Sequence, residues 1–345
     1  MGIIEDSEKL KQEIDQDDKE LLKIVLFGQP GSGKSSLINA IVGKDVAKAS
    51  QRTDATTDVA EVCAYNGLVF VDLPGYGTAK FPENEFFSKF SIEEFDLFLC
   101  VFSGKFHKTD TEFFRILQEK GKVCLFVRSK ADDIWQPNKT EEELKNEIIE
   151  DVHSQVGAPV QVYFTSVRRE EGISELDDAI LKAIGPAKIG RFVRTFKART
   201  VEQLANKKEV CEKLITKYSG LAAANAINPI PGMGVCVDIK VIYDLFSKIR
   251  DAYGLSTESL QAAAPFLPLA NNILKYALKE GIITLLKQYP AKEGIKEMAK
   301  YVPFVGQVIA ATAGFYVVKF AGTSYLNDCH QVAKGILEKQ LEYNQ

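Results

Sequence analysis

The chain has 345 residues, of which 46% are hydrophobic and 26% charged, and its formal net charge is −4. At roughly 150 residues per domain this length favours two domains, and the composition excludes an intrinsically disordered chain. Acidic residues outnumber basic ones, which argues against nucleic acid as a partner. The six cysteines form no CxxC pair, so neither a zinc site nor a disulfide framework is expected. The acidic, polar start is unlike a signal peptide, which favours a cytoplasmic location.

The first half of the chain predicts alternating strands and helices after a surface helix over residues 5–20. Apolar runs predict strands at 22–27, 59–65, 68–71, 97–102, 123–127 and 160–164. Helical periodicity falls between them, at 34–42, 109–119, 141–155 and 174–184. This alternation predicts an α/β domain over residues 21–186 with a mainly parallel sheet.

After Gly185-Pro186 the strand signals stop, and residues 187–345 predict an all-helical domain. Helices are expected from Asp238 onward, at 270–289 and at 327–342, and the helix of residues 1–20 could pack against them. Two stretches, 218–237 and 301–318, carry no charge. Because prolines and glycines interrupt both, we expect a buried helical hairpin in preference to a membrane span.

A phosphate-binding loop is predicted between the first strand and the helix that follows it. Its residues match GxxxxGK[ST] and are Gly28, Gln29, Pro30, Gly31, Ser32, Gly33, Lys34 and Ser35, followed by Ser36. A glycine-rich loop that leads into a helix N-terminus makes several N–H donors converge on phosphate. Lys34 would add a positive charge at the β- and γ-phosphates, and Ser35 a hydroxyl for Mg²⁺.

A second motif, DxxG, ends the strand that begins near Leu68. Asp72 is expected to hold Mg²⁺ through water, and the Gly75 N–H to meet the γ-phosphate. The residue after this motif is Tyr76, where small signalling GTPases carry the glutamine that positions water. Since a tyrosine has no amide for this task, we expect slow hydrolysis in the isolated chain.

A third motif indicates guanine as the base. Ser129-Lys130-Ala131-Asp132 follows a strand and is a variant of NKxD. A carboxylate at Asp132, with Asp133 as the alternative, accepts from guanine N1–H and N2–H₂ together, which adenine does not offer. Lys130 can lie across the base, whereas Ser129 replaces the usual asparagine and removes an amide.

Two further loops complete the expected nucleotide site. The polar loop 53–58 offers Thr57, or alternatively Thr56, as a hydroxyl that reaches Mg²⁺ and the γ-phosphate. Thr165-Ser166, at the end of the last strand, is expected either to contact the base or to form a plain turn. Together the motifs predict binding of GTP and GDP with Mg²⁺.

On these motifs the chain resembles the immunity-related GTPases, an interferon-inducible group related in behaviour to dynamins. The resemblance lies in residues 28–36, 72–77, 95–99 and 127–132, and in the helical segments 230–232 and 253–260. It implies a Ras-like P-loop GTPase domain inserted between N- and C-terminal helices that form one all-α domain. It also implies GTP-dependent self-assembly and action at intracellular membranes, often those of pathogen-containing vacuoles.

The resemblance also bears on single residues. Glu61 matches a family glutamate implicated at a nucleotide-to-nucleotide dimer interface, and the alternative for it is an exposed strand charge. Lys34 is the family's ordinary lysine, whereas Gln29 stands where members often carry glutamate. Gly2 is present for N-myristoylation, but Asp6 replaces the Ser or Thr of that motif.

The sequence therefore predicts a Mg²⁺-dependent GTP hydrolase with Lys34, Thr57, Gly75 and Glu61 as catalytic residues. It is expected to form a homodimer or oligomer through its nucleotide face and to bind intracellular membranes peripherally, through residues 301–318 or 188–217, in cell-autonomous defence. One alternative is a translational or assembly GTPase with an RNA partner, although the helical half shows no RNA-binding module. A second alternative is a nucleotide-stabilised scaffold with little turnover.

Overall fold

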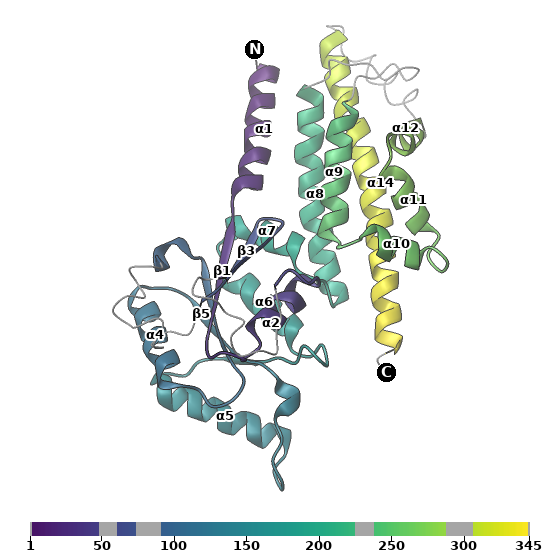
Figure 1. Cartoon of the computed structure of the whole chain (residues 1–345). Helices are drawn as coiled ribbons and strands as arrows, with labels where there is room; N and C mark the ends of the chain where they lie inside the picture. Colours follow the sequence, from purple (N-terminus) through teal and green to yellow (C-terminus); the bar gives the residue numbers. More distant parts are fainter. Residues whose placement is uncertain (1, 48–60, 74–90, 225–237, 288–305, 344–345) are drawn as a thin grey trace. The chain divides into compact units, whose positions relative to one another are not determined.

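The computed structural model describes residues 2–47, 61–73, 91–224, 238–287 and 306–343 (Figure 1). The chain packs as two units. Residues Glu20–Lys197 form the first, an α/β unit, and Met1–Lys19 with Ala198–Gln345 form the second, a helical unit.

A six-stranded sheet forms the centre of the α/β unit, in the order β2-β3-β1-β4-β5-β6. The strands are β1 (Leu22–Phe27), β2 (Glu61–Tyr65), β3 (Leu68–Asp72), β4 (Leu97–Phe102), β5 (Cys124–Arg128) and β6 (Val162–Phe164). All neighbours are parallel except β2, which runs antiparallel to β3 at the edge. Because β1, β3, β4 and β5 are parallel, their carboxyl ends lie at one edge of the sheet, and the strand order reverses direction at β1, where ligands bind in such folds.

Helices cover both faces of this sheet. They are α2 (Lys34–Val42), α4 (Lys108–Glu119), α5 (Glu141–Val156), α6 (Ile173–Ala183) and α7 (Pro186–Thr195). One face, with Phe98 and Phe126, packs against α4 and α5 through Phe113 and Val152 (Figure 1). Alternate strand residues point to the other face, where α2 and α7 contact β3. Burial on both faces explains why these strands read as continuous apolar runs.

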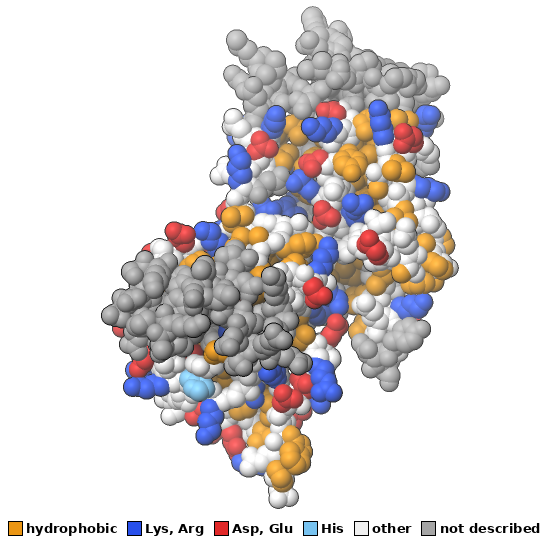
Figure 2. Space-filling view, in the orientation of Figure 1, with side chains coloured by type: hydrophobic (Ala, Val, Ile, Leu, Met, Phe, Trp, Pro, Cys, Tyr) orange, Lys and Arg blue, Asp and Glu red, His pale blue; other side chains and the backbone are white. Residues whose placement is uncertain are grey.

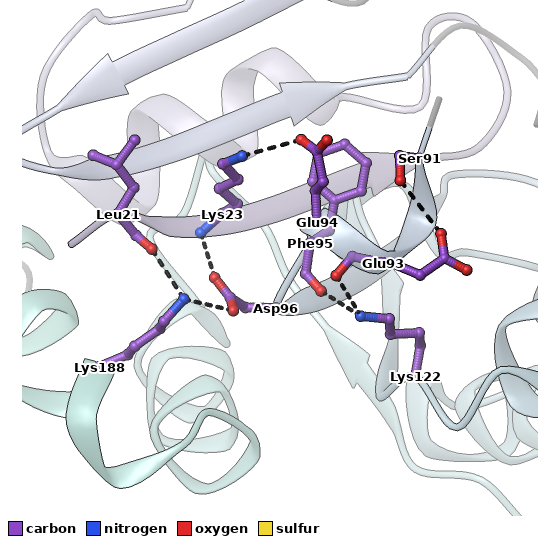
Figure 3. A network of polar contacts seen from close by, with 9 residues as sticks. All are labelled: Leu21, Lys23, Ser91, Glu93, Glu94, Phe95, Asp96, Lys122 and Lys188. Atoms are coloured by element: carbon purple, nitrogen blue, oxygen red, sulfur yellow. Dashed lines mark hydrogen bonds and ion pairs between the residues drawn. The ribbon is translucent and has the colours of Figure 1, made fainter. Parts of the chain in front are cut away.

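The amino ends of β1 and β4 are joined by the side chain of Asp96 (Figure 3). Its carboxylate accepts the Lys23 N–H at 2.8 Å and pairs with the Lys188 ammonium of α7 at 2.6 Å. The same ammonium donates to the carbonyl oxygen of Leu21 at 3.0 Å. Lys188 thus ties α7 to the start of β1, and α7 belongs to the α/β unit, although the sequence placed the domain boundary before it, at 186/187.

The helical unit combines the N-terminal helix with the second half of the chain. It contains α1 (Gly2–Lys19), α8 (Val201–Ala224), α9 (Ile239–Ala252), α10 (Thr257–Ala263), α11 (Leu269–Tyr276), α12 (Lys279–Lys287) and α14 (Gly306–Tyr343). The long helices α8 and α14 pack along one another, and α1 packs on α8. Gly220 of α8 admits this contact because a Cβ there would lie 2.7 Å from the Leu10 Cδ1 atom. The predicted all-α domain with an N-terminal contribution is confirmed.

Two helical expectations are wrong in the described residues. The segment 306–318 is no hairpin, since it is the first part of α14, a continuous helix of 38 residues. Within this segment Val317 and Val318 are fully buried and pack inside the unit, whereas Tyr316 is exposed. The expected helix at 270–289 is two helices, α11 and α12. None of the described helices is both long enough and apolar enough to span a bilayer.

Candidate nucleotide-binding site

The loop Gly28–Gly33 joins β1 to α2 and begins where β1 passes β4. A Cβ on Gly28, whose φ is +129°, would lie 2.1 Å from the Val101 carbonyl oxygen, so no side chain fits there. Gly33 is the N-cap of α2 in a left-handed conformation, with φ +87°. Between them the crest at Pro30 and Gly31 is exposed, whereas Ser32 is buried and its hydroxyl has no partner in the described structure. The loop has the form of a phosphate cradle.

Lys34 is buried beneath this loop, with its side chain 6% exposed. Its ammonium donates to the carbonyl oxygens of Gly28 at 3.0 Å and Gln29 at 3.3 Å. It also lies 3.6 Å from the Asp72 Oδ1 atom. The sheet register sets this distance, because Asp72 at the end of β3 stands opposite Leu26 of β1.

Oxygen atoms suited to binding a hard cation lie near the Lys34 ammonium. The Asp72 carboxylate is buried, and Ser35 is the second residue of α2, directly after Lys34 and next to Ser36. Carboxylate and hydroxyl oxygens are ligands that Mg²⁺ accepts, so the residues present fit this ion. The other expected contacts, Thr57 or Thr56 and Gly75, lie outside the described residues, as does Tyr76.

The loop after β5 lies against the phosphate loop. The Ser129 hydroxyl donates to the carbonyl oxygen of Ser32 and lies 3.2 Å from that of Phe102. Lys130, in a left-handed conformation with φ +53°, donates from its ammonium to the Gly31 carbonyl oxygen at 2.9 Å. The third sequence motif therefore contacts the first, as a shared nucleotide site requires.

Asp132 faces the loop after β6. Its Oδ1 atom accepts from the Ser166 hydroxyl at 2.6 Å, and its Oδ2 atom lies 3.9 Å from the Arg168 guanidinium. The hydrogen bond from Ser166 lowers the pKa of the Asp132 carboxyl, which keeps it ionised at neutral pH. Asp133 is exposed and has no such bond to Ser166, so the geometry favours Asp132 as the base-recognising carboxylate.

The backbone of Thr165 connects the loop after β6 to the loop after β5. Its N–H donates to the Arg128 carbonyl oxygen at 2.9 Å, and its own carbonyl oxygen accepts from Ala131 N–H at 3.0 Å. The Thr165 hydroxyl is buried without a partner in the described structure. The loop is thus more than a plain turn, because it fixes the position of the Ser129–Asp132 segment.

The sequence motifs missed the first turn of α4 as part of the site. The Gln29 amide donates to the Thr109 hydroxyl at 3.3 Å, which places α4 against the phosphate loop. Asp110 is buried there, and burial raises the pKa of its carboxyl. An acidic residue at the start of a helix that follows a parallel strand was the available signal.

The sequence agrees with this geometry over nearly its whole length. Residues 3–340 match the model of the interferon-inducible GTPase family. The chain belongs to the interferon-inducible GTPase family. The predicted resemblance is confirmed, and this family member is a GTPase that binds GTP and GDP.

Individual relatives are distant. The Mus musculus interferon-gamma-inducible GTPase 10 is 23% identical, and the match covers 94% of this chain and 82% of the relative. The Mus musculus interferon-inducible GTPase 1 is 25% identical, with 72% of this chain and 64% of the relative covered. Among solved structures, Aquifex aeolicus Era bound to GDP·AlF₄⁻ shares 20% identity with a TM-score of 0.37 over 57% of this GTPase and 68% of Era.

Replacing the carboxylate should change the base preference of this GTPase. In Asp132→Asn the amide presents a donor where guanine has a donor, whereas xanthine has a carbonyl there. We expect GDP affinity to fall by about 10- to 100-fold, the cost of losing hydrogen bonds to a charged group, and affinity for xanthosine diphosphate to rise. Titration with labelled nucleotides measures both. Asp133→Asn is the matched control and should bind GDP normally; the reverse pattern would assign the base to Asp133.

Proposed function

We propose that this GTPase is a Mg²⁺-dependent switch that hydrolyses GTP efficiently only when two copies meet through their nucleotide faces. We further propose that it acts peripherally on intracellular membranes, as part of cell-autonomous defence. The observation that supports GTP binding is that Lys34, Asp72 and the Ser129–Asp132 loop all lie at the phosphate loop, residues 28–35.

In this proposal the phosphates lie in the cradle formed by residues 28–35. Lys34 would exchange its contacts with loop carbonyls for the β- and γ-phosphates, because a charge-assisted bond to phosphate is stronger than one to a neutral carbonyl. Ser35, Asp72 and Thr57 would hold Mg²⁺. When bound, that ion neutralises charge on the β- and γ-phosphate oxygens. Asp132 and Lys130 would hold the guanine.

Hydrolysis needs a group that orients the attacking water. The Tyr76 side chain has no amide group to do this. The Gly75 N–H, which we place at the γ-phosphate, can only donate a hydrogen bond and cannot accept one from the water. Completing such a site is worth about 10⁵-fold in rate in Ras-like enzymes. We therefore assign the missing contribution to a second copy of the chain. Glu61 is our candidate, acting across the interface or on the nucleotide hydroxyls.

The backbone position of Glu61 supports this choice. It opens β2, the edge strand of the sheet, and pairs in register with Asp72. A residue one strand away from the proposed Mg²⁺ ligand, on the outermost strand, is well placed to meet a second copy. Its side chain lies outside the described residues.

Hydrolysis should depend on protein concentration. Specific activity is expected to rise by at least about tenfold from sub-micromolar to tens of micromolar chain, as dimers complete the site. Glu61→Ala should flatten this rise and leave the GDP affinity of the monomer nearly unchanged, whereas the surface control Glu142→Ala should behave as wild type. Phosphate release at several enzyme concentrations measures this. Constant specific activity in the wild type would show that one chain completes the site.

The membrane contact is proposed for the helical unit. In the basic stretch 188–217, Lys188 and Lys197 are already engaged by Asp96 and Glu170 within the protein. On α14, by contrast, Tyr316 is 46% exposed and Lys319 is exposed one turn later. An aromatic ring beside a lysine suits the lipid–water interface.

On the face drawn in Figure 2, charges of both signs are intermingled, unlike the basic stripe that nucleic acid would need.

Liposome flotation of the full chain tests this contact. Wild type is expected to float with vesicles that contain anionic lipid, and the double variant Tyr316→Ser, Lys319→Gln to float less. The control is Tyr243→Ser on α9, which removes a tyrosine of similar exposure, 51% against 46% for Tyr316. Equal flotation of all three proteins would contradict the assignment to α14.

A further inference from the structure

We propose that Asp110, in the first turn of α4, is a positioning residue of the phosphate site. Its buried carboxylate is a counter-charge of Lys34 that holds the ammonium beneath the phosphate loop and opposes the binding of phosphate. The inference rests on the proposed nucleotide site and deepens it. It gives a role to a buried carboxylate that lies outside the three sequence motifs.

The first observation is that α4 lies over the point where β1 becomes the phosphate loop. The ring of Phe113 on α4 meets the ring of Phe27, the last residue of β1, edge-on, with 4.5 Å between the ring centroids. Asp110 lies one turn before Phe113, so both side chains are on the same face of α4. The Asp110 carboxyl therefore lies on the side of α4 that faces the end of β1.

The same turn of α4 contacts the phosphate loop directly. The Thr109 hydroxyl accepts a hydrogen bond from the Gln29 amide at 3.3 Å. The carbonyl oxygens of Gln29 and of Gly28 before it accept from the Lys34 ammonium, at 3.3 and 3.0 Å. The part of the loop that binds the ammonium is therefore the part that α4 contacts.

The second observation is the burial of the Asp110 carboxyl. The residue is 4% exposed, and its Oδ2 atom accepts no hydrogen bond from the residues that the structure describes. Capping a helix does not require burial, since Glu143, the third residue of α5 as Asp110 is of α4, caps from an exposed position. Burying a carboxylate without full hydrogen bonding is costly. The charge of Asp110 therefore calls for a partner beyond its own helix.

The third observation is that Lys34 supplies the opposite charge. Burial raises the pKa of the Asp110 carboxyl, whereas the neighbouring His107 and the Lys34 ammonium lower it. The buried thiol of Cys100 on β4 responds to both charges: burial raises its pKa, Asp110 raises it further, and Lys34 lowers it. Both charged groups therefore lie near this thiol, in a buried region where salt screens their attraction only weakly.

Phosphate binding would change the balance among these charges. The Asp72 carboxylate, 3.6 Å from the Lys34 ammonium, has a proposed role as a Mg²⁺ ligand, whereas Asp110 has none. When the ammonium turns to the phosphates, Asp110 loses part of its counter-charge and faces added negative charge. The Asp110 carboxylate thus favours the arrangement of Lys34 without nucleotide. Neutralising it should strengthen nucleotide binding.

The experiment measures the GDP affinity of the full chain in the presence of Mg²⁺, by titration with labelled nucleotide. Asp110→Asn keeps the shape of the side chain and one oxygen for the helix end, and it removes the charge. It is expected to bind GDP about three- to tenfold more tightly, the effect of one Coulomb interaction between partly screened charges. Glu119→Gln neutralises an exposed carboxylate on the same helix and should bind GDP as wild type does.

The pH profile separates this role from a structural one. Protonation neutralises Asp110 in the wild type, so the affinity gap between wild type and Asp110→Asn should narrow as the pH is lowered from about 7.5 to about 5. The other titratable groups around Asp110 are Lys34, His107 and Cys100. Both proteins contain them, so their effects cancel, as does the ionisation of the nucleotide. If Asp110→Asn does not fold, Asp110→Ser, which also removes the charge, replaces it in both measurements.

Three results would overturn the inference. Unchanged or weaker GDP binding in Asp110→Asn would mean that the carboxylate does not oppose phosphate. A gap that is constant across the pH range would assign the effect to the shape of the side chain, and an equal gain in Glu119→Gln would make it a general effect of net charge. Failure of the wild-type chain to bind GDP would instead contradict the proposed nucleotide site itself, so the two failures are distinguishable.

Discussion

The close passage of β1 beside β4 is the constraint on which the site depends. At Gly28 the two strands leave no room for a Cβ, since the Val101 carbonyl oxygen lies where it would stand. The chain can therefore leave β1 at this point only through a glycine. That turn directs α2 so that Lys34 lies under the loop and within 3.6 Å of Asp72. The charge and the carboxylate are brought together by backbone packing before any ligand is considered.

The opposite end of the same strands is fixed by charge. Asp96 holds the first residues of β1 and the ammonium of Lys188, which also reaches the Leu21 carbonyl oxygen (Figure 3). The chain enters the α/β unit after Lys19 just before β1 and leaves it after Lys197 just beyond α7, so this carboxylate joins the elements next to both passages. At one edge of the sheet Asp96 and Lys188 hold the amino end of β1, and the opposite edge carries the loops of the candidate site.

Patterns local in sequence predicted most of the fold. The strand 22–27 and the helix 34–42 have the predicted bounds, because apolar runs and the flanking glycines specify both. The antiparallel direction of β2 was not predicted, since strand direction depends on pairing and leaves no periodic signal. The continuity of α14 was also missed. Gly306 and Gly314 suggest a break, but packing of the long helix along α8 overrides their low helix propensity.

The site was predicted in its motifs and missed in its connections. GxxxxGKS, DxxG and SKAD each fall at the end of a strand, so their convergence follows from a parallel sheet. The bond from Ser129 to Ser32, the pairing of Asp132 with Ser166 and the contact of Gln29 with Thr109 join residues 34 to 97 positions apart. Such contacts exist only once the loops are side by side, and no spacing rule within one segment indicates them.

Hydrogen exchange of the full chain with and without GDP and Mg²⁺ tests the central claim most directly, that three separate loops form one nucleotide site. The account predicts that nucleotide slows exchange together in residues 28–35, 129–132 and 165–167, with no change at the opposite edge around Lys23 and Asp96. Protection limited to residues 28–35, with the loops after β5 and β6 unaffected, would contradict it.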